Sequence, residues 1–323
     1  MKNILVLGGS GFVGRHLCEK LQRQGWRSSV PTRQPSRARA LQHLPLVTVL
    51  PADVHDPAQL QRLLSGHDAV VNLVAILHGN QAAFERVHVE LPTQLAQACA
   101  ATGVRRVLHL SALGANLDGP SRYQRSKARG EERLRQAGLD LTVLRPSVIF
   151  GAGDRFLNLF ADLQAVFPLL PLACAHARFQ PVWVEDVANA VLACLRDSEL
   201  PQSSIGQTYE CCGPDVLTLA ELVRLAGRLG SRQRALLPLP RALGQLQALL
   251  MELLPGPPLI SRDNLDSMAV DNVASSQWPG LGALGIAPAS VYAIAPSYLG
   301  RRGARSPLLA LRSGAQDRSH TRR

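Results

Sequence analysis

The first fourteen residues constrain this chain most, because they join a buried-strand pattern to a glycine-rich turn. A continuous apolar run over residues 4–7 leads into glycines at positions 8, 11 and 14, and a helical pattern follows. Glycine there permits a tight turn, close approach of backbone N–H groups to a pyrophosphate, and packing of the helix on the strand. The helix N-terminus favours the negative charge. The turn therefore predicts a nucleotide site, with expected contacts at Gly8, Ser10, Gly11, Phe12, Val13 and Gly14.

Length and composition limit the class of protein. A chain of 323 residues with 46% hydrophobic residues can build a large α/β domain with a smaller lobe. No run reaches the ~18–20 apolar residues of a membrane-spanning helix, and no signal peptide is recognisable. Six scattered cysteines indicate reduced, mostly buried thiols, and no residue spacing indicates a metal site. We expect a cytoplasmic protein.

The net charge of +11 is concentrated at the end of the chain. Residues 300–323 contain seven arginines and one aspartate, a net charge of +6, and no aromatic residue. Because nucleic-acid binding usually combines basic groups with stacking aromatics, we expect no nucleic-acid partner. This segment is expected to be a disordered, solvated tail, and loose attraction to anionic lipid heads is the alternative.

Strand and helix patterns alternate along the first half of the chain. Strands are expected at 27–32, 46–50, 68–75, 106–111 and 141–145, and helices at 58–64, 82–101 and 122–137. This alternation predicts an α/β fold, a Rossmann-type doubly wound parallel sheet over residues 1–150. Leucine-rich helices broken by prolines predict a smaller, mostly helical lobe over residues 151–299, interleaved with the sheet.

One helix of this lobe carries leucines at helical spacing, namely Leu243, Leu246, Leu250 and Leu253. Such a stripe is most often core, so we expect it inside the lobe. The alternative is an exposed patch that docks on a membrane surface or a subunit, because the proline-rich segment after it could hold it outward.

The segment after the second strand indicates which dinucleotide is bound. An NAD site usually has an acidic residue about 20 residues past the glycines, to hold the ribose 2′-OH. Residues 28–33 contain no acidic residue, and Arg33 and Arg37 stand there instead. A guanidinium suits a 2′-phosphate, so NADP(H) is favoured over NAD(H). Asp53, after the third strand, is placed to meet the adenine amino group, or simply begins the next helix.

Tyr123 and Lys127 form the candidate catalytic pair. Their i, i+4 spacing puts a phenol and an ammonium on one helix face, where the lysine would lower the phenol pKa and make the tyrosine a general acid/base. The lysine can also hold the cofactor ribose. Ser111, which ends the preceding strand, is the third candidate. His88 and His109 lie in apolar surroundings and are expected to be core residues.

Together these residues resemble the extended and atypical branch of the short-chain dehydrogenase/reductase superfamily, which is NAD-dependent epimerase/dehydratase-like. The matching segments are the glycine turn, Asp53, Asn72–Ala75, Ser111, Tyr123/Lys127, Leu144–Ser147 and residues 179–188. The resemblance adds Val54, Val74, Ala75, Lys127 and Pro146 to the expected cofactor contacts.

Three further motifs are similar to the complex I accessory-subunit family (alpha subcomplex subunit nine) and its bacterial relatives. They are Tyr123-x-Arg125-Ser126-Lys127-Ala128-x-Gly130-Glu131, Gly151-x-x-Asp154-Arg155-Phe156-Leu157-Asn158, and residues 254–259. The resemblance covers residues 1–299. It implies tightly bound NADP(H) without established turnover, a respiratory-complex or quinone-pathway protein partner, and a peripheral position at the inner face of the cytoplasmic membrane.

One departure from the superfamily pattern bears on catalysis. In active members the serine that assists the tyrosine usually sits a residue or two past the strand end, where this chain has Ala112 and Leu113. Losing that donor costs of order 10²-fold in rate. Three functions stay open. The protein is an accessory or assembly protein, an enzyme that uses Tyr123 and Lys127 on a carbonyl or sugar-nucleotide substrate, or a regulator that reports the NADPH/NADP⁺ ratio through partner binding.

Overall fold

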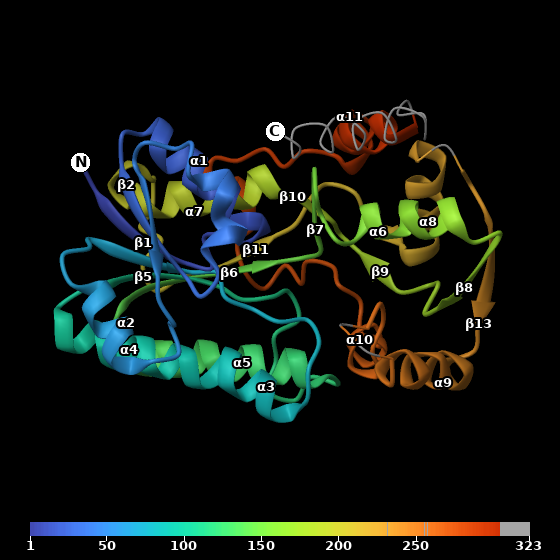
Figure 1. Cartoon of the computed structure of the whole chain (residues 1–323), viewed down its shortest axis with the longest axis horizontal. Coiled ribbons are helices and arrows are strands. Elements are labelled where there is room, and N and C mark those ends of the chain that lie inside the picture. The colour runs from blue at the N-terminus through green and yellow to red at the C-terminus, as the bar shows by residue number, and fades with distance from the viewer. Residues whose placement is uncertain (231, 255, 257, 304–323) are drawn as a thin grey trace, which may run out of the picture.

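A seven-stranded parallel sheet forms the centre of the protein (Figure 1). The computed structural model describes residues 1–230, 232–254, 256 and 258–303. In spatial order the strands are β11 (Thr208–Cys211), β6 (Asp140–Pro146), β5 (Arg106–Leu110), β4 (Ala69–Asn72), β1 (Asn3–Leu7), β2 (Arg27–Thr32) and β3 (Val47–Pro51). The order reverses between β1 and β4. The Rossmann-type doubly wound fold is therefore confirmed, and the reversal is where such sheets bind ligands.

Helices cover both faces of this sheet. Helices α1 (Phe12–Arg23) and α7 (Val184–Leu195) pack against each other on one face. The other face carries α2 (Pro57–Leu64), α4 (Leu91–Thr102) and α5 (Arg122–Gln136) (Figure 1). Each face has its own apolar core. All six cysteines are free and all but Cys174 are buried, as expected for mostly buried thiols.

The helix expected over residues 82–101 is divided into three parts. Helix α3 (Gln81–Glu85) leads into a π turn, η2 (Arg86–Glu90), before α4 begins. Pro92 has no N–H to donate to the His88 carbonyl four residues earlier. That carbonyl instead lies against Gly130 of α5, where an added Cβ would come within 1.9 Å of the His88 oxygen. The π turn therefore accompanies a very close approach of two helices.

The smaller lobe has its own core and short two-stranded ribbons. Its helices are α6 (Leu157–Val166), α8 (Leu219–Leu229), α9 (Arg241–Glu252), α10 (Arg262–Ser267) and α11 (Val291–Gly303). Its strands are β7 (Ile149–Phe150), β8 (Leu169–Ala173), β9 (Arg178–Phe179), β10 (Val182–Trp183), β12 (Leu217–Thr218) and β13 (Ala235–Leu239). Two short helical turns, η3 (Asp197–Glu199) and η4 (Leu281–Leu284), complete the elements beyond residue 150.

The chain crosses between sheet and lobe more than once. Strand β11 and helix α7 come from beyond residue 150 and join the sheet layer, whereas α6 and α8 build the lobe. The division near residue 150 stays a prediction. Residues 300–303 continue α11, and the expectation of a disordered tail otherwise concerns residues 304–323, which lie outside the described residues.

The buried side chain of Asp154 explains one of the family-like motifs. Its carboxylate accepts hydrogen bonds from the backbone N–H groups of Gly151, Phe156 and Asn158. It also accepts one from the Tyr298 hydroxyl on α11, at 3.0 Å. Asp154 therefore joins the start of α6 to the last helix of the lobe.

The expectation that the α9 leucines form lobe core is wrong. Leu243, Leu246, Leu250 and Leu253 are all exposed, and the helix faces the protein with Gly244 and Ala248 instead. Apolar spacing shows that a helix has an apolar face but not what that face meets. Within the described residues, no helix is both long and apolar enough to cross a membrane.

Candidate nucleotide-binding site

The glycine turn has the geometry of a pyrophosphate cradle. Gly8 has φ +80°, and a Cβ there would lie 3.1 Å from the Leu73 carbonyl carbon. A Cβ on Gly14 would come within 2.5 Å of the Gly8 oxygen, so α1 can pack on the turn only with glycine. No described side chain caps the N-terminus of α1 at Gly11. The free N–H groups of that first turn, which includes Phe12 and Val13, suit an anion.

The adenosine end lies beyond β2 and β3. Arg33 directly follows β2 and is exposed. Arg37 lies in a short 3-10 helix, η1 (Pro35–Leu41), but its side chain is outside the described residues. Asp53 follows β3 and accepts a hydrogen bond from the backbone N–H of His55 at 3.0 Å. Asp53 does not begin α2, because Asp56 caps that helix.

A second arginine approaches this end. Burial lowers the pKa of His55, and the positive charges of Arg86 and Arg33 lower it further, against the opposing charge of Asp53. Arg86 comes from the π turn and was not expected here. Val54, next to Asp53, packs against the core under α2 and α4. Two arginines, Arg33 and Arg86, therefore lie within electrostatic range of the loop after β3.

The nicotinamide end lies where β4, β5 and β6 finish. Val74 and Ala75 follow β4, Ser111 follows β5, and Pro146 is the last residue of β6. The Val74 N–H donates to the Asn72 side-chain oxygen at 3.2 Å. The carboxyl ends of parallel strands share one edge of a sheet, so these residues gather beside the glycine turn.

The Ser111 hydroxyl is buried and has no hydrogen-bond partner among the described residues. Ala112 and Leu113, which follow it, are also buried. The strand end therefore presents an unpaired hydroxyl at Ser111 and two apolar side chains at the positions where active relatives usually have a donor.

Helix α5 carries the tyrosine–lysine pair. A capping box between Ser121 and Gln124 starts the helix. The Lys127 ammonium is buried and donates to the Leu110 carbonyl at 2.9 Å. Burial lowers the pKa of Lys127 to about 8, against the opposing charge of Glu131. The pair is present at the same sheet edge as the glycine turn.

The expected lowering of the phenol pKa is wrong for this structure. Burial raises the pKa of Tyr123 above the ordinary phenol value. The Tyr123 ring packs edge-on against Phe84 and His88, at centroid distances of 6.3 and 5.5 Å. Desolvation by these rings disfavours the phenolate.

His88 joins the loop after β4 to helix α5. Its Nε2 accepts the Ile76 N–H at 3.2 Å, so its Nδ1 carries the proton and donates to the Ser126 hydroxyl at 2.9 Å. Ser126 in turn donates to the Tyr123 carbonyl. Burial, and then the charge of Lys127, lower the pKa of His88 to about 2. His88 is buried as expected, but its position beside Tyr123 was missed, since spacing alone showed no partner.

A buried ion pair holds the other end of α5. Arg145 donates to both oxygens of Glu131, at 2.9 and 2.7 Å, and so ties the helix to β6. Glu131 and Gly130 belong to the same family-like motif as Tyr123. The motif therefore supplies packing and anchoring of α5 as well as the candidate catalytic pair.

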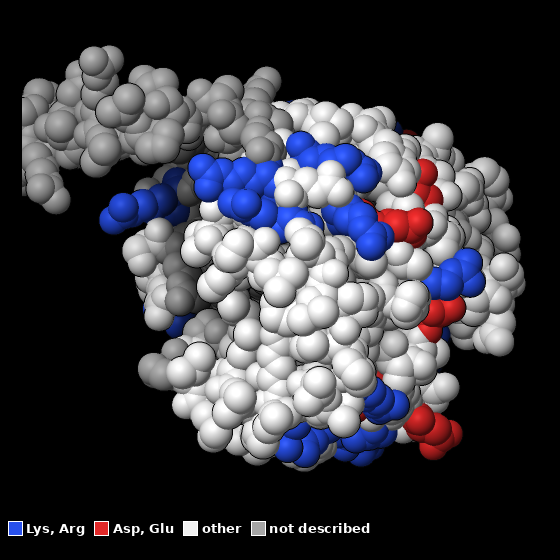
Figure 2. All heavy atoms as spheres, turned by 90° about the vertical axis from the view of Figure 1, so that its right-hand side faces the viewer, with Lys and Arg blue, Asp and Glu red and all other residues white. Residues whose placement is uncertain are grey.

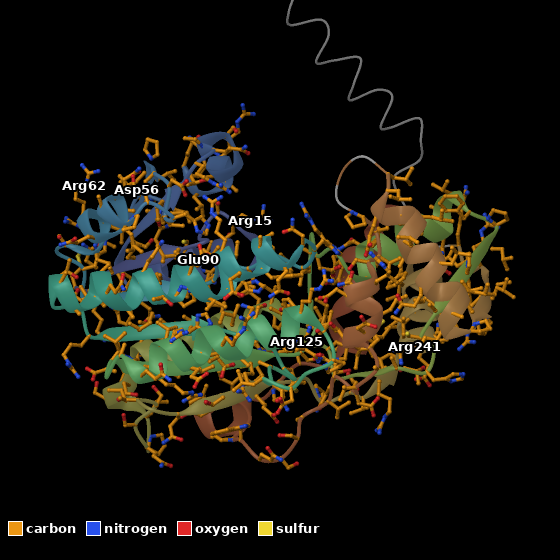
Figure 3. All side chains as sticks on the ribbon, turned by 90° about the horizontal axis from the view of Figure 1, so that it is seen from below. Arg15, Asp56, Arg62, Glu90, Arg125 and Arg241 are labelled. Atoms are coloured by element: carbon orange, nitrogen blue, oxygen red, sulfur yellow. The ribbon has the colours of Figure 1, made fainter. Side chains whose placement is uncertain are left out.

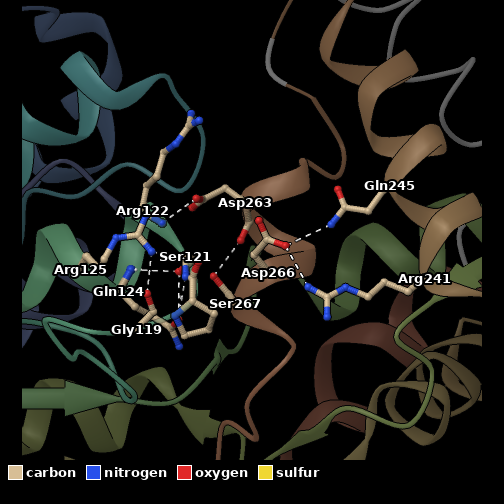
Figure 4. A network of polar contacts seen from close by, with 11 residues as sticks. Gly119, Ser121, Arg122, Gln124, Arg125, Arg241, Gln245, Asp263, Asp266 and Ser267 are labelled. Atoms are coloured by element: carbon tan, nitrogen blue, oxygen red, sulfur yellow. Dashed lines mark hydrogen bonds and ion pairs between the residues drawn. The ribbon is translucent and has the colours of Figure 1, made fainter.

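The lobe also holds the N-terminus of α5. The Asp263 carboxylate, from α10, accepts the backbone N–H groups of Arg122 and Tyr123 at 2.7 and 3.1 Å (Figure 4). Asp266, one turn later, contacts Arg241 and Gln245 of α9. Figure 3 shows Arg125 at the lobe end of α5, with Arg241 across from it in the lobe. Helix α10 thus bridges α5 and α9, which local sequence patterns did not indicate.

The chain is similar in sequence to known proteins. The chain is 31% identical over 290 residues to mouse NADH dehydrogenase [ubiquinone] 1 alpha subcomplex subunit 9, mitochondrial, which covers 88% of this chain and 76% of that protein. It is 30% identical over 239 residues to the ceramide reductase of Caulobacter vibrioides, covering 73% of each.

The fold matches solved structures as well. A UDP-glucuronic acid 4-epimerase from Bacillus cereus, solved with NAD, superposes with a TM-score of 0.65 at 16% identity, over 82% of this chain and 97% of that one. The family model described as "NAD dependent epimerase/dehydratase family" matches residues 4–211. Because this match covers more than half of the chain, the chain belongs to the NAD-dependent epimerase/dehydratase family.

Proposed function

We propose that this protein holds NADP(H) as a tightly bound group and serves an accessory or assembly role connected with respiratory complex I or quinone metabolism. The observation that carries the proposal is the end of β5, where Ala112 and Leu113 are apolar and buried. Without a hydroxyl donor at these positions, a substrate carbonyl would lose a polarising hydrogen bond. Relatives named as complex I subunits support the choice of partner.

Bound at this site, the dinucleotide would supply hydride chemistry. The glycine turn with Ser10 would hold its pyrophosphate, and Asp53 with Val54 its adenine. The nicotinamide would lie against Val74, Ala75 and Pro146. Lys127 would hold the ribose. The supporting features are the uncapped N-terminus of α1 and the glycines that leave no room for a Cβ. Tyr123 would face the reacting end, whereas the buried Ser111 hydroxyl would lie at the strand end, short of the position from which a donor reaches a substrate carbonyl.

The preference for NADP(H) rests on the cations beyond β2 and β3. Arg33 and Arg86 both lie near enough to His55 to lower its pKa, and a 2′-phosphate would be attracted to the same region. Replacing Arg33 by Glu should reduce NADP(H) affinity at least tenfold and NAD(H) affinity much less. Arg27→Glu is the matched control. Arg27 is exposed and begins the same strand, so it lies at the end of β2 away from the expected nucleotide. If the two variants lose NADP(H) affinity equally, Arg33 does not set the preference for NADP(H).

The decisive experiment releases and identifies the bound nucleotide. The protein is purified gently, the nucleotide is extracted with acid and separated by chromatography, and hydride exchange is tried with quinones and sugar nucleotides. Tightly held NADP(H) that no acceptor oxidises is the expected result. A nucleotide that one acceptor oxidises rapidly would replace the accessory role by an enzymatic one.

A second function is supported by the retained catalytic pair and by the relative named as a ceramide reductase. In this alternative the protein is an active NAD(P)-dependent oxidoreductase or epimerase/dehydratase acting on a carbonyl or sugar-nucleotide substrate. Tyr123 would give or take the proton at the substrate oxygen while Lys127 holds the ribose. Tyr123→Phe should then abolish turnover and leave nucleotide content nearly unchanged. Loss of the nucleotide in this variant would favour a structural role for Tyr123.

The accessory role implies a location beside the membrane that carries the respiratory complex. We place the protein in the cytoplasm, bound peripherally to the inner face of the cytoplasmic membrane. The supporting relatives are those named as subunits of NADH dehydrogenase [ubiquinone]. Fractionation of cells should find the protein with membranes and release it at high pH, as for a peripheral protein.

A further inference from the structure

Helix α9 is packed with its small residues inward and its large apolar residues outward. A Cβ on Gly244 would lie 2.5 Å from the Ala173 Cβ, and Ala248 is fully buried. The outward residues are between 52% and 74% exposed, and they are Leu243, Leu246, Leu250, Leu253 and Leu254. We call these five leucines the α9 surface. A soluble helix normally buries such side chains, so this arrangement points to an occupant outside the chain.

The apolar area continues beyond α9 onto a neighbouring ribbon. Strands β8 and β13 pair in parallel, with Leu169 opposite Ala235 and Pro171 opposite Leu237. Leu169 and Leu237 are exposed on the outward side of this ribbon, and α9 packs against β8. Val166 and Phe167, just before β8, are exposed too. The apolar surface therefore spans several elements at one end of the molecule.

Arginines border the ribbon side of this area, whereas the two arginines beside α9, Arg241 and Arg262, are paired with Asp266 and Glu252. Residues 219–254 contain five arginines and two glutamates, and Glu221 and Glu252 are engaged by Thr218 and Arg262. Arg232 and Arg234 donate to the backbone carbonyls of residues 165 and 164, which places both guanidinium groups beside the exposed segment 166–167. Figure 2 shows a broad area without charge at this end, with basic side chains along its upper and lower edges and acidic side chains among them toward the right.

We propose that the α9 surface docks this protein on an anionic lipid bilayer. Large exposed leucines on one face of a helix, with Arg232 and Arg234 beside the adjoining exposed apolar segment, are the chemistry of an interfacial helix whose apolar face enters the acyl boundary. The arginines would then meet lipid phosphates. The proposal rests on the peripheral location in the proposed function and adds the surface and the lipid class.

The same charges argue against a second copy of the chain as the occupant. A symmetric dimer through the α9 surface would bring like-charged arginines of the two copies together, which is unfavourable. Among the described side chains that line the hollow along the α9 surface, Gln247 alone is polar, so few groups there could specify a protein partner by hydrogen bonds. A bilayer needs no such group.

The test is binding of the full chain, with its bound nucleotide, to vesicles of phosphatidylcholine with or without phosphatidylglycerol. The expected result is sedimentation with the phosphatidylglycerol vesicles and binding at least tenfold weaker without that lipid. Leu246→Gln combined with Leu250→Gln should weaken binding by at least tenfold, since two apolar side chains are lost. Ile205→Gln is the matched control, because Ile205 is exposed and follows η3, outside the lobe elements.

Nucleotide content and thermal stability are measured on the same preparations, so that failure of the docking proposal is separate from failure of nucleotide binding. Equal vesicle binding by wild type and the double variant would overturn the proposal. So would a wild-type dimer that the double variant converts to monomer, because the surface would then join two copies. A third variant replaces the five arginines of residues 304–323 by Gln, and loss of binding in it alone would move the docking function to that segment. The five are Arg305, Arg312, Arg318, Arg322 and Arg323.

Discussion

Helices α5 and α9 distribute polarity in opposite ways. Helix α5 buries Lys127 and Glu131, and both have partners: the Leu110 carbonyl and the Arg145 guanidinium. Helix α9 exposes its leucines and buries only Gly244 and Ala248. Burying a polar group costs free energy unless the group has a hydrogen-bond or ion-pair partner. An exposed leucine contributes to stability only when another surface covers it.

The two helices therefore give different kinds of evidence about function. In α5 the evidence is internal, because each buried polar group can be traced to its partner in the same chain. In α9 the evidence is an exposed apolar face that no described segment of the chain covers. The partner that binds this face is therefore inferred from the chemistry of the face alone. Helix α10 connects the two through Asp263 and Asp266.

The largest effect is expected from Gly130→Ala in α5. The new Cβ would meet the His88 carbonyl oxygen at 1.9 Å, and neither backbone can move away freely. Overpacking of this kind costs about 3 kcal/mol, whereas the helix propensity gained from alanine is at most about 1 kcal/mol. Denaturant unfolding should therefore show a net loss of about 2 kcal/mol. In Gly282→Ala, the control, the added Cβ meets open space, and equal stability of both variants would contradict the close approach.

The next effect concerns the pH dependence of folding at His88. Its pKa is about 2 in the folded protein and 6.5 ordinarily, so the unfolded chain binds one more proton between these values. Stability is therefore full above pH 6.5 and falls as the pH drops below it, by about 2 kcal/mol from this residue at pH 5. His88→Asn should reduce the loss of unfolding free energy between pH 7 and pH 5.

The matched control for this measurement is His43→Asn, since His43 is exposed. A pH dependence that is identical in wild type and His88→Asn would mean that His88 has the same pKa in the folded and unfolded states, so that it takes up a proton in the folded protein by pH 5. The hydrogen bond from the Ile76 N–H to its Nε2 would then be absent.

The smallest effect is expected on the outward face of α9. Leu250→Gln should change the free energy of unfolding by less than about 0.5 kcal/mol in the absence of lipid, because the side chain already meets water. Ala248→Leu, on the inward face, should instead cost about 1–3 kcal/mol by overpacking. If thermal unfolding ranks the two variants in the opposite order, the orientation of α9 is wrong.

Local patterns in the sequence predicted most of the sheet. The expected strands over 27–32 and 106–111 match β2 and β5 to within one residue, and the helix over 122–137 matches α5. The glycine turn and the Tyr123/Lys127 spacing were found for the same reason, since each depends on residues a few positions apart. The cofactor preference stays a prediction.

The sequence by itself determined the nucleotide cradle, the alternation of strands and helices, and the presence of an apolar stripe on α9. The tertiary structure alone decided which way that stripe faces, which partners hold His88, and that Asp263 binds the start of α5 from 140 residues away. These features depend on contacts between distant segments. The sequence pattern of an apolar stripe or a single histidine is the same whether the residue packs in the core, meets solvent or belongs to a functional site.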